Sequence, residues 1–405
     1  MTGEGGNQGP LAGIRVLEFG QVLAVPYLGL TLSDLGAEVI KVEPPTGEPT
    51  RGFMPPDVDG HSPYFLSMNR NKLALTLDLK QPSAIGAIHA LAAKTDVVIE
   101  NYRVGVMERL GIGYDDLRAI NPRLIYAAIS GYGRTGPLAG RPGYDPISQA
   151  ESGLMAISGE AGGPPTRTGV AVVDVVAGLY AGQAILAALY ARERSGKGQR
   201  VDANLHATGL NMLANFTGNA LLCDDDPTRF GSGSQAAQPS GVYQSSDGEF
   251  MMAVAADAMY RRFCEQVIER PDLADDPRFT KNAGRLANKA AMDAELAPLF
   301  AAMTNAQVIE RMNAAAIPCG EIMGVRDALY SPTTEALDLI TTAQHTELGE
   351  LKTLKPAFQL SETPVRDPVG APLLGEHTRD VLTRVAGLDE AKIDAMIAEG
   401  AAITS

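Results

Sequence analysis

Residues 13–20 read GIRVLEFG, and they are followed by VPYLGLTLSDLG at 25–36 and by AEVIKVE at 37–43. The first and third stretches are short apolar runs typical of buried strands, and the stretch between them has the residue spacing of a helix. Together they predict a strand-helix-strand unit. Because the strands show no polar alternation, we expect them to belong to a parallel sheet that is covered on both faces.

The same rhythm continues along the first third of the chain. Further strands are predicted in LALTLDL at 73–79, DVVIEN at 96–101 and LIYAAISGYG at 124–133, with a helix at about 81–94. Right-handed crossovers between parallel strands then give an α/β, Rossmann-like layer structure. The first strand is not followed by G-x-G-x-x-G, so this sheet is not predicted to bind a dinucleotide.

A long helix is predicted at 174–194, where DVVAGLYAGQAILAALYARER is apolar over most of its surface. We expect it to be buried and to stop at SGKG, with Gly196 and Gly198 suited to a left-handed backbone. A hairpin in VYQSSDGEFMMAVA and helices near 258–270, 289–303 and 306–315 then predict a second, smaller α+β domain. Two C-terminal helices, in GEHTRDVLTRVAG and DEAKIDAMIAEGAA, are expected to pack back on the first domain.

These changes of pattern predict the domain boundaries. A large Rossmann-like domain takes in residues 10–220, a linker and mobile loop covers 221–241, the small domain covers 242–330, and 331–405 forms a linker that returns to the large domain. The first ten or so residues are expected to form a loose tail.

Composition narrows the class of protein. The formal net charge is −14, with a sequence pI near 4.9, which disfavours nucleic acid and anionic membrane surfaces as partners. The three cysteines are far apart and form no disulfide framework, so a reducing cytoplasm fits best. The start of the chain lacks the order of a signal peptide, and no apolar run approaches the roughly 18 to 20 residues that span a bilayer. The five histidines have no metal-ligand spacing, so no metal site is predicted.

One carboxylate stands out for its chemistry. Asp174 follows a small apolar run and opens the long helix. At a helix N-terminus the free N–H groups stabilise an anion, which would keep this carboxylate ionised and able to attack an acyl carbonyl. The alternative is that Asp174 only caps its helix. Asp145, in the turn GRPGYDPIS at the start of another helix, carries the same two interpretations.

Two basic segments are candidates for binding phosphates. Arg103 and Arg109 follow the strand at 96–101, at the sheet edge where open α/β folds bind ligands. The segment NRNK at 69–72 is a second candidate. For both segments the alternative is an ordinary solvated face.

Nearly the whole chain resembles the class III CoA-transferase family, which includes formyl-CoA transferase, carnitine CoA-transferase and α-methylacyl-CoA racemase. The resemblance is carried, in this order, by GIRVLEFGQVLAVP, LGAEVIKVEPP, SMNRNKLALTLDL, DVVIENYRVGVMERLG, INPRLIYAAISGYGRTGP, GRPGYD, ARERSGKGQRVD and DPRFTKNAGR. It implies an interlocked homodimer whose large domain is built from both termini.

The resemblance also implies an activity. Asp174 falls on the nucleophile of the family, which carries CoA as an aspartyl thioester between an acyl-CoA donor and a free carboxylic acid. Tyr144 and Asp145 fall on a further catalytic pair. CoA is then a substrate, with no tightly bound cofactor, and its contacts carry over to Val22, Leu23, Asn69, Arg70, Asn71, Asn101, Tyr102, Arg103 and Arg109. Succinyl-CoA or another short dicarboxylyl-CoA is the expected donor.

Other interpretations stay open at this point. A racemase or epimerase of acyl-CoA could use the same fold, although that branch has a histidine where this chain has Tyr144, and tyrosine is a weaker base. A non-catalytic CoA-binding protein is a further alternative if Asp174 is only a cap. The loop at 231–241 is expected to close over the active site, and the alternative is a plain flexible linker.

Overall fold

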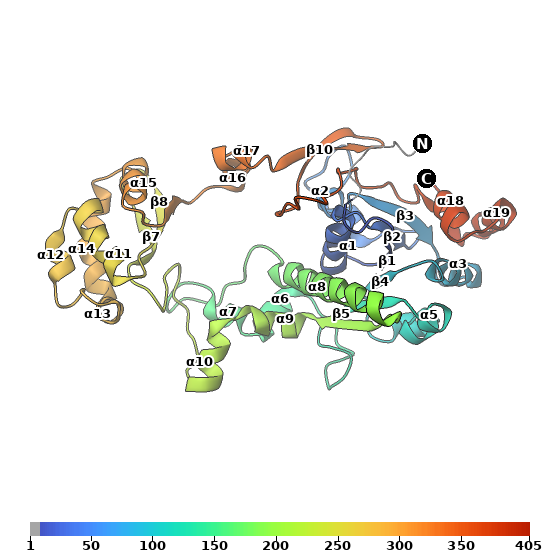
Figure 1. The fold of residues 1–405 in the computed structure, drawn as a ribbon, viewed down its shortest axis with the longest axis horizontal. Helices are drawn as coiled ribbons and strands as arrows, with labels where there is room; N and C mark the ends of the chain where they lie inside the picture. The colour runs from blue at the N-terminus through green and yellow to red at the C-terminus, as the bar shows by residue number, and fades with distance from the viewer. Residues whose placement is uncertain (1–8) are drawn as a thin grey trace. The chain divides into compact units, whose positions relative to one another are not determined.

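The computed structural model describes residues 9–405 and divides into two compact units (Figure 1). Unit 1 contains the chain up to Leu154 together with Thr168–Thr217 and Thr333–Ser405. Unit 2 contains Met155–Arg167 and Gly218–Pro332. The loose tail predicted at the start of the chain falls mostly outside the described residues.

The centre of unit 1 is a seven-stranded sheet in the order β12-β3-β2-β1-β4-β5-β6. Its parallel strands are β1 (Arg15–Phe19), β2 (Glu38–Glu43), β3 (Lys72–Leu77), β4 (Val97–Glu100), β5 (Ile125–Ser130) and β6 (Arg200–Asn204). The order 3-2-1-4-5-6 is that of doubly wound Rossmann-type sheets, so the predicted parallel sheet is confirmed. An antiparallel edge strand, β12 (Ala402–Ile403), was not predicted; it pairs with β3.

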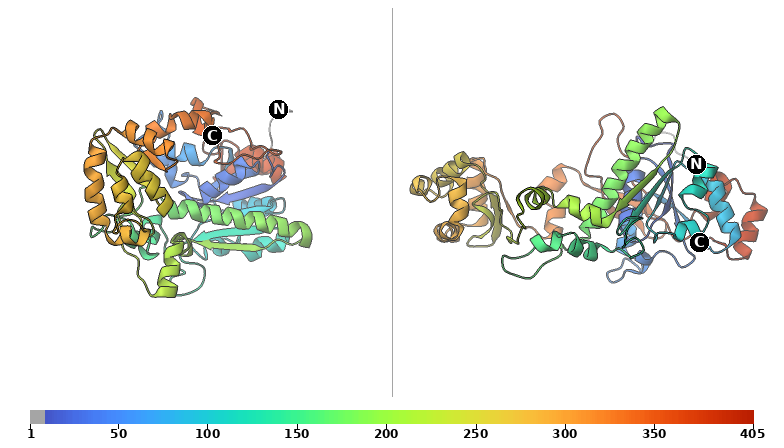
Figure 2. Two further views of the ribbon diagram at one scale, coloured as in Figure 1. Left: turned by 60° about the vertical axis from the view of Figure 1, so that its left-hand side comes forward. Right: turned by 90° about the horizontal axis from the view of Figure 1, so that it is seen from below.

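Both faces of this sheet are buried, because successive strand residues point to opposite sides. Leu17 and Phe19 of β1 lie in one hydrophobic core, whereas Val16 lies in the other. The first core is covered by α3 (Pro82–Ala92), α5 (Tyr114–Ile120), η3 (Val381–Val385) and α19 (Glu390–Ala398). The second is covered by α1 (Ala24–Asp34) and α8 (Val172–Ser195), and Figure 2 shows α8 lying along the sheet. The predicted return of the C-terminal helices to this core is confirmed.

Helix α8 is the predicted long helix, but only one of its faces is buried. Val173, Ala177, Ala181, Ile185 and Leu189 belong to the second core. Its other face exposes Leu179, Leu186 and Tyr190, so the expectation that this helix is buried holds for one face and not for the other. By length and composition alone α8 could cross a membrane, with a mean hydropathy of 1.8 in its most apolar window, which corrects the expectation that no apolar run is long enough. Its packing is that of a core helix, since it lies against α1, β5 and β6.

The end of α8 was predicted only in part. Gly196 caps the helix with φ of 70°, as expected. Gly198 does not have the predicted left-handed backbone; it lies so close to β5 that a Cβ atom would be 2.0 Å from the carbonyl oxygen of Leu124. Close backbone approach is therefore the reason for glycine at this second position.

Unit 2 contains an antiparallel sheet of β7 (Ser240–Gln244), β8 (Glu249–Ala253) and β9 (Cys319–Glu321). The first two strands confirm the predicted hairpin. Its helices include the greater part of α10 (Asn215–Cys223) and all of α11 (Asp257–Arg262), η2 (Phe263–Val267), α12 (Pro271–Asp275), α13 (Asn282–Ala287), α14 (Lys289–Ala301), α15 (Asn305–Ala314) and α16 (Val325–Leu329). Helix α10 extends into the beginning of the segment predicted as a linker. Closure of 231–241 over an active site stays a prediction.

The remaining elements are short. A hairpin of β10 (Ile340–His345) and β11 (Gly349–Leu354) occupies a stretch that the sequence pattern left irregular. The short helices are η1 (Pro49–Gly52), α2 (Pro63–Met68), α4 (Val106–Arg109), α6 (Asp145–Glu151), α7 (Leu154–Ile157), α9 (Leu205–Met212), α17 (Pro332–Ala336) and α18 (Thr378–Asp380).

Candidate active site

A pocket of about 390 Å³ opens at the carboxyl ends of β1, β4 and β5. Strands β1 and β4 are neighbours, and the chain leaves them toward opposite sides of the sheet. Loops therefore diverge at this point and leave a crevice, which is where open α/β sheets bind ligands. The pocket is lined by Gln21 to Ala24, Asn101 to Val104, Val106, Ile129 to Gly131, Ala139, Arg141 to Tyr144, Asp174 and Leu205.

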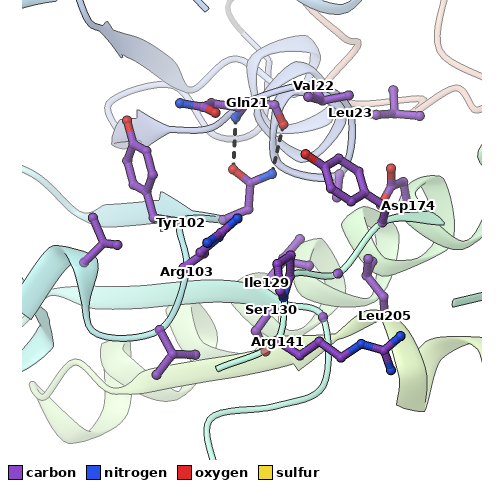
Figure 3. Close-up of a pocket in the computed structure, with 18 of the residues that line it drawn as sticks. Gln21, Val22, Leu23, Tyr102, Arg103, Ile129, Ser130, Arg141, Asp174 and Leu205 are labelled. Carbon is purple, nitrogen blue, oxygen red and sulfur yellow. Dashed lines mark hydrogen bonds between the residues drawn. The ribbon is translucent and has the colours of Figure 1, made fainter. Parts of the chain in front are cut away.

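Asp174 lies on this pocket, in the first turn of α8 (Figure 3). It is the third residue of the helix, and the N-cap position is occupied by Ala171, which makes no side-chain capping bond. The interpretation of Asp174 as a helix cap is therefore wrong. Its side chain is partly buried and remains available to the pocket.

The cap of α8 is provided from a distance by Asp145. One oxygen of this buried carboxylate accepts hydrogen bonds from the amides of Val173, at 2.8 Å, and Asp174, at 3.2 Å. The other accepts from the side-chain nitrogen of Gln149 at 2.5 Å. One of the two interpretations of Asp145, that it caps the helix that it begins, is wrong, because that helix, α6, has Tyr144 at its N-cap. Asp145 instead fixes the backbone that carries Asp174.

This arrangement reverses the expected electrostatics of Asp174. The sequence predicted that the free amides of its helix would keep the carboxylate ionised, but Asp145 already occupies two of those amides. Burial, followed by the negative charge of Asp145, raises the pKa of Asp174 to about 7. Asp174 can therefore exchange its proton near neutral pH, which is typical of functional carboxylates.

Two glycines position the loop that carries Tyr144 and Asp145. Gly131, after β5, packs so closely on Gly143 that a Cβ on either residue would approach the Cα of the other within 2.6 Å. Tyr144 follows this contact, lines the pocket and is exposed. The structure thus brings Tyr144, Asp145 and Asp174 together, although 28 residues separate Val173 from Asp145.

Five of the predicted CoA contacts line the pocket, namely Val22, Leu23, Asn101, Tyr102 and Arg103. The amide group of Asn101 is used within the protein. It accepts a hydrogen bond from the Gln21 amide at 3.0 Å and donates one to the Gln21 carbonyl at 2.9 Å (Figure 3). Asn101 therefore joins the loop after β4 to the loop after β1.

The predicted contacts at residues 69–71 lie elsewhere in unit 1. Asn69, Arg70 and Asn71 are buried, so the alternative of a solvated face is wrong for them. Arg70 pairs with Asp34 at 2.5 Å, and Asn71 donates to the other oxygen of Asp34 at 2.8 Å. These side chains hold the end of α1, and their contact with CoA stays a prediction.

The contact of Arg109 with CoA stays a prediction, and a second arginine was not predicted at all. Arg109 ends α4, is exposed and does not line the pocket. Arg141 lines it but was missed, because nothing in the Gly- and Pro-rich sequence around it signals a site. One of its nitrogens bonds Glu151 at 2.7 Å, and the other oxygen of Glu151 accepts from the hydroxyl of Tyr132 at 2.6 Å. Among residues 9–405, no group of three or more acidic, histidine or cysteine side chains is arranged to hold a metal.

The chain has a doubly wound sheet, and an acidic side chain lies in a pocket where the strand order reverses, between β1 and β4. These features define the class of protein, an α/β enzyme that binds its ligand at the carboxyl edge of the sheet. Comparison with known proteins identifies the family. The model described as CoA-transferase family III matches residues 11–378. The chain belongs to this family and is a CoA-transferase.

Individual relatives agree with this assignment. The succinyl-CoA:glutarate CoA-transferase of Mus musculus is 36% identical over 392 residues, which cover 96% of this chain and 90% of that protein. The formyl-CoA:oxalate CoA-transferase of Streptomyces avermitilis is 33% identical over 410 residues, covering 96% and 98%. A crystal structure of a CaiB/BaiF family protein from Brucella suis matches with a TM-score of 0.84 and 35% identity, covering 93% of this chain and 100% of that one. The racemase alternative gains no support from these relatives.

Proposed function

We propose that the protein moves CoA from a short dicarboxylyl-CoA, such as succinyl-CoA, to a free carboxylic acid through a thioester on Asp174. The observation that carries this proposal is the position of Asp174, in the pocket and on a helix turn held by Asp145. A carboxylate with a raised pKa is a stronger nucleophile than an ordinary one once it is ionised.

The reaction would proceed by four acyl exchanges. The Asp174 carboxylate attacks the donor carbonyl, which forms a mixed anhydride and releases the CoA thiolate. The thiolate attacks the aspartyl carbonyl, which forms the aspartyl-CoA thioester and releases the donor acid. The acceptor carboxylate attacks this thioester and forms a second anhydride with release of the thiolate. Attack of the thiolate on the acceptor carbonyl yields the new acyl-CoA and restores the Asp174 carboxylate.

Intact-protein mass spectrometry tests this mechanism. Wild type and Asp174→Ala are incubated with a panel of acyl-CoA thioesters and then with hydroxylamine, which traps an activated carboxyl as the hydroxamate. We expect a CoA-sized adduct, or a hydroxamate at Asp174, on the wild type alone. Transfer at an undiminished rate by Asp174→Ala would disprove the aspartyl intermediate. Deuterium uptake at the α-carbon of an acyl-CoA without an acceptor acid would favour racemisation instead.

A second cation in the pocket supports a dicarboxylate as substrate. Arg103 and Arg141 both line the pocket, so one guanidinium can face an anionic group of CoA while the other faces a distal carboxylate. The Mus musculus relative is named for two dicarboxylates, succinate and glutarate. We expect Arg141→Gln to raise KM for dicarboxylic acids about tenfold and for matched monocarboxylic acids by much less. An equal rise for both classes would disprove this role.

We also propose a homodimer, interlocked as the resemblance implies. Leu179, Leu186 and Tyr190 lie on one side of α8, are spaced by seven and four residues, and are 40 to 67% exposed. An apolar stripe of this kind is typical of a protein interface, and its proposed partner is a second copy of this chain. Light scattering is expected to give twice the chain mass for wild type. Leu186→Glu with Tyr190→Glu should shift that mass toward the monomer, and a stable, active wild-type monomer would rule out the dimer.

A further inference from the structure

The loop after β1 has an unusual backbone at the wall of the pocket. Val22 has φ of 64°, a left-handed conformation that β-branched residues rarely adopt. Val22 and Leu23 both line the pocket, and Leu23 is the N-cap of α1. Figure 3 shows them on the same side of the pocket as Asp174. Such a conformation persists only where the surroundings determine it strongly.

Side chains from distant elements hold the backbone of Gly20, Gln21 and Val22. Lys41 donates to the carbonyl of Gly20 at 2.9 Å. The carboxamide of Asn101 binds both backbone groups of Gln21. A carboxylate oxygen of Glu48 accepts from the amide of Val22 at 3.0 Å. The three residues between β1 and Leu23 are thus each held by a side chain from a distant part of the sequence.

Glu48 is itself fixed in place. It is 2% exposed, and its second oxygen accepts from the hydroxyl of Thr50 at 2.7 Å. The ammonium group of Lys41 lies 3.5 Å from that same oxygen. The backbone amide of Glu48 is held by a carboxylate oxygen of Glu43 at 3.1 Å. The carboxylate that meets Val22 therefore cannot turn away without breaking buried contacts.

We propose that Glu48 is a positioning residue for CoA transfer, which holds Val22 in its left-handed conformation so that Val22 and Leu23 form the wall of the CoA pocket beside Asp174. Glu48 does not line the pocket, so it acts through Val22. Without its acceptor, the Val22 peptide would relax to negative φ and displace the start of α1. This inference rests on the proposed function in one respect, namely that CoA binds in this pocket.

A double-mutant cycle tests the role of Glu48. Glu48→Ala is expected to raise KM for acyl-CoA and the Kd for CoA by about tenfold, with a smaller change in kcat. Val22→Gly removes a side chain that lines the pocket and should weaken CoA binding by itself, but glycine adopts positive φ without strain and does not need Glu48 to hold it. In the Val22→Gly background, Glu48→Ala should therefore raise Kd much less than it does in the wild type. A purely structural role of Glu48 gives the same loss in both backgrounds.

Three further variants sharpen this test. Thr50→Val removes the contact to the other Glu48 oxygen but leaves the hydrogen bond to Val22, so it is expected to weaken CoA binding less than Glu48→Ala does. Glu48→Gln keeps an acceptor oxygen for the Val22 amide and should bind CoA more tightly than Glu48→Ala. Val22→Pro removes the same hydrogen bond from the other side and fixes φ near −65°, so it should weaken CoA binding even if Glu48→Ala fails to fold.

The outcomes separate this role from the proposed function. Failure of the wild type to bind CoA by calorimetry would overturn both. Wild-type binding of CoA, with additive effects in the cycle or with an unchanged Kd for Val22→Pro, would overturn the role of Glu48 alone.

Discussion

The raised pKa of Asp174 predicts how the rate of CoA transfer depends on pH. The proposed nucleophile is the Asp174 carboxylate, and a pKa of about 7 leaves it mostly protonated at pH 6 and mostly ionised at pH 8. The ionised fraction rises from about one tenth to about nine tenths over that interval, so kcat/KM for the donor should rise roughly tenfold. Activity is therefore present above pH 7 and is lost as the pH falls through the pKa of the folded protein.

Substitution of Asp145 tests how much of the raised pKa of Asp174 comes from the negative charge of Asp145. Asp145→Asn removes the negative charge that is the second cause of the raised pKa, so the midpoint of the profile should move to lower pH. Burial is the first cause and is unchanged, so the midpoint should stay above the ordinary value of 3.8. Asp145→Asn is also expected to lower kcat/KM, because asparagine cannot accept a hydrogen bond at both ends of its side chain. If its oxygen accepts from the α8 amides, its NH2 group faces the NH2 group of Gln149. Gln149 is held in this orientation because its own oxygen accepts from the amide of Thr168.

Steady-state kcat/KM between pH 5.5 and 9, at constant ionic strength, measures both midpoints. Glu193→Gln is the matched control, because it removes one exposed charge from the far end of the same helix, about 28 Å along the axis. It should leave the midpoint unchanged. A flat wild-type profile between pH 6 and 8, or an upward shift in Asp145→Asn, would refute the assignment of Asp174 and of its electrostatic cause.

Three predictions concern stability. The pKa of Asp174 is about 7 in the folded protein and 3.8 in the unfolded chain, so the folded protein holds this proton more tightly between those two pH values. The free energy of unfolding therefore falls as the pH rises through that range. Asp174→Asn should raise Tm at pH 8 relative to wild type, with little gain at pH 4. Gly198→Ala should lower the free energy of unfolding by about 2 kcal/mol, because its methyl group meets backbone, whereas Gly86→Ala, in a helix with open space around it, should stabilise by about 0.5–1 kcal/mol. Lys72→Met leaves a buried glutamate without one of its ammonium partners and should cost about 3–5 kcal/mol in urea unfolding, compared with at most about 0.5 for exposed Lys80→Met.

The sequence predicts the sheet well where the signal is local. Strands β1 to β5 are buried apolar runs, and their pattern alone predicts them. Strand β6 has the sequence RVDAN and no fully buried residue, so it lacks the apolar signal. Strand β12 has only two residues and exists because the C-terminal helices return the chain to β3. Neither strand could be predicted without the tertiary fold.

The candidate site likewise has one feature that a local sequence pattern predicts and others that depend on the tertiary fold. The place of Asp174 at the start of a long apolar helix is a local pattern, and it was predicted correctly. The partner that caps this helix, Asp145, is distant in sequence, and no spacing rule connects the two. The contact of Glu48 with Val22 also depends on the fold, because 26 residues separate them and Val22 carries no sequence signal of a left-handed backbone.

The pairing of Asp145 with Asp174 has a consequence for the direction of the proposed reaction. In the first mixed anhydride, the CoA thiolate can attack either carbonyl, and the carboxylate on the other side then leaves. The better leaving group is the weaker base. An ordinary carboxylic acid has a pKa near 4, whereas burial and Asp145 raise that of Asp174 to about 7, so the donor acid should leave in preference to Asp174. Attack then falls on the aspartyl carbonyl, so the raised pKa of Asp174 favours formation of the thioester, whereas in the second anhydride the same preference opposes release of Asp174 and slows the last exchange.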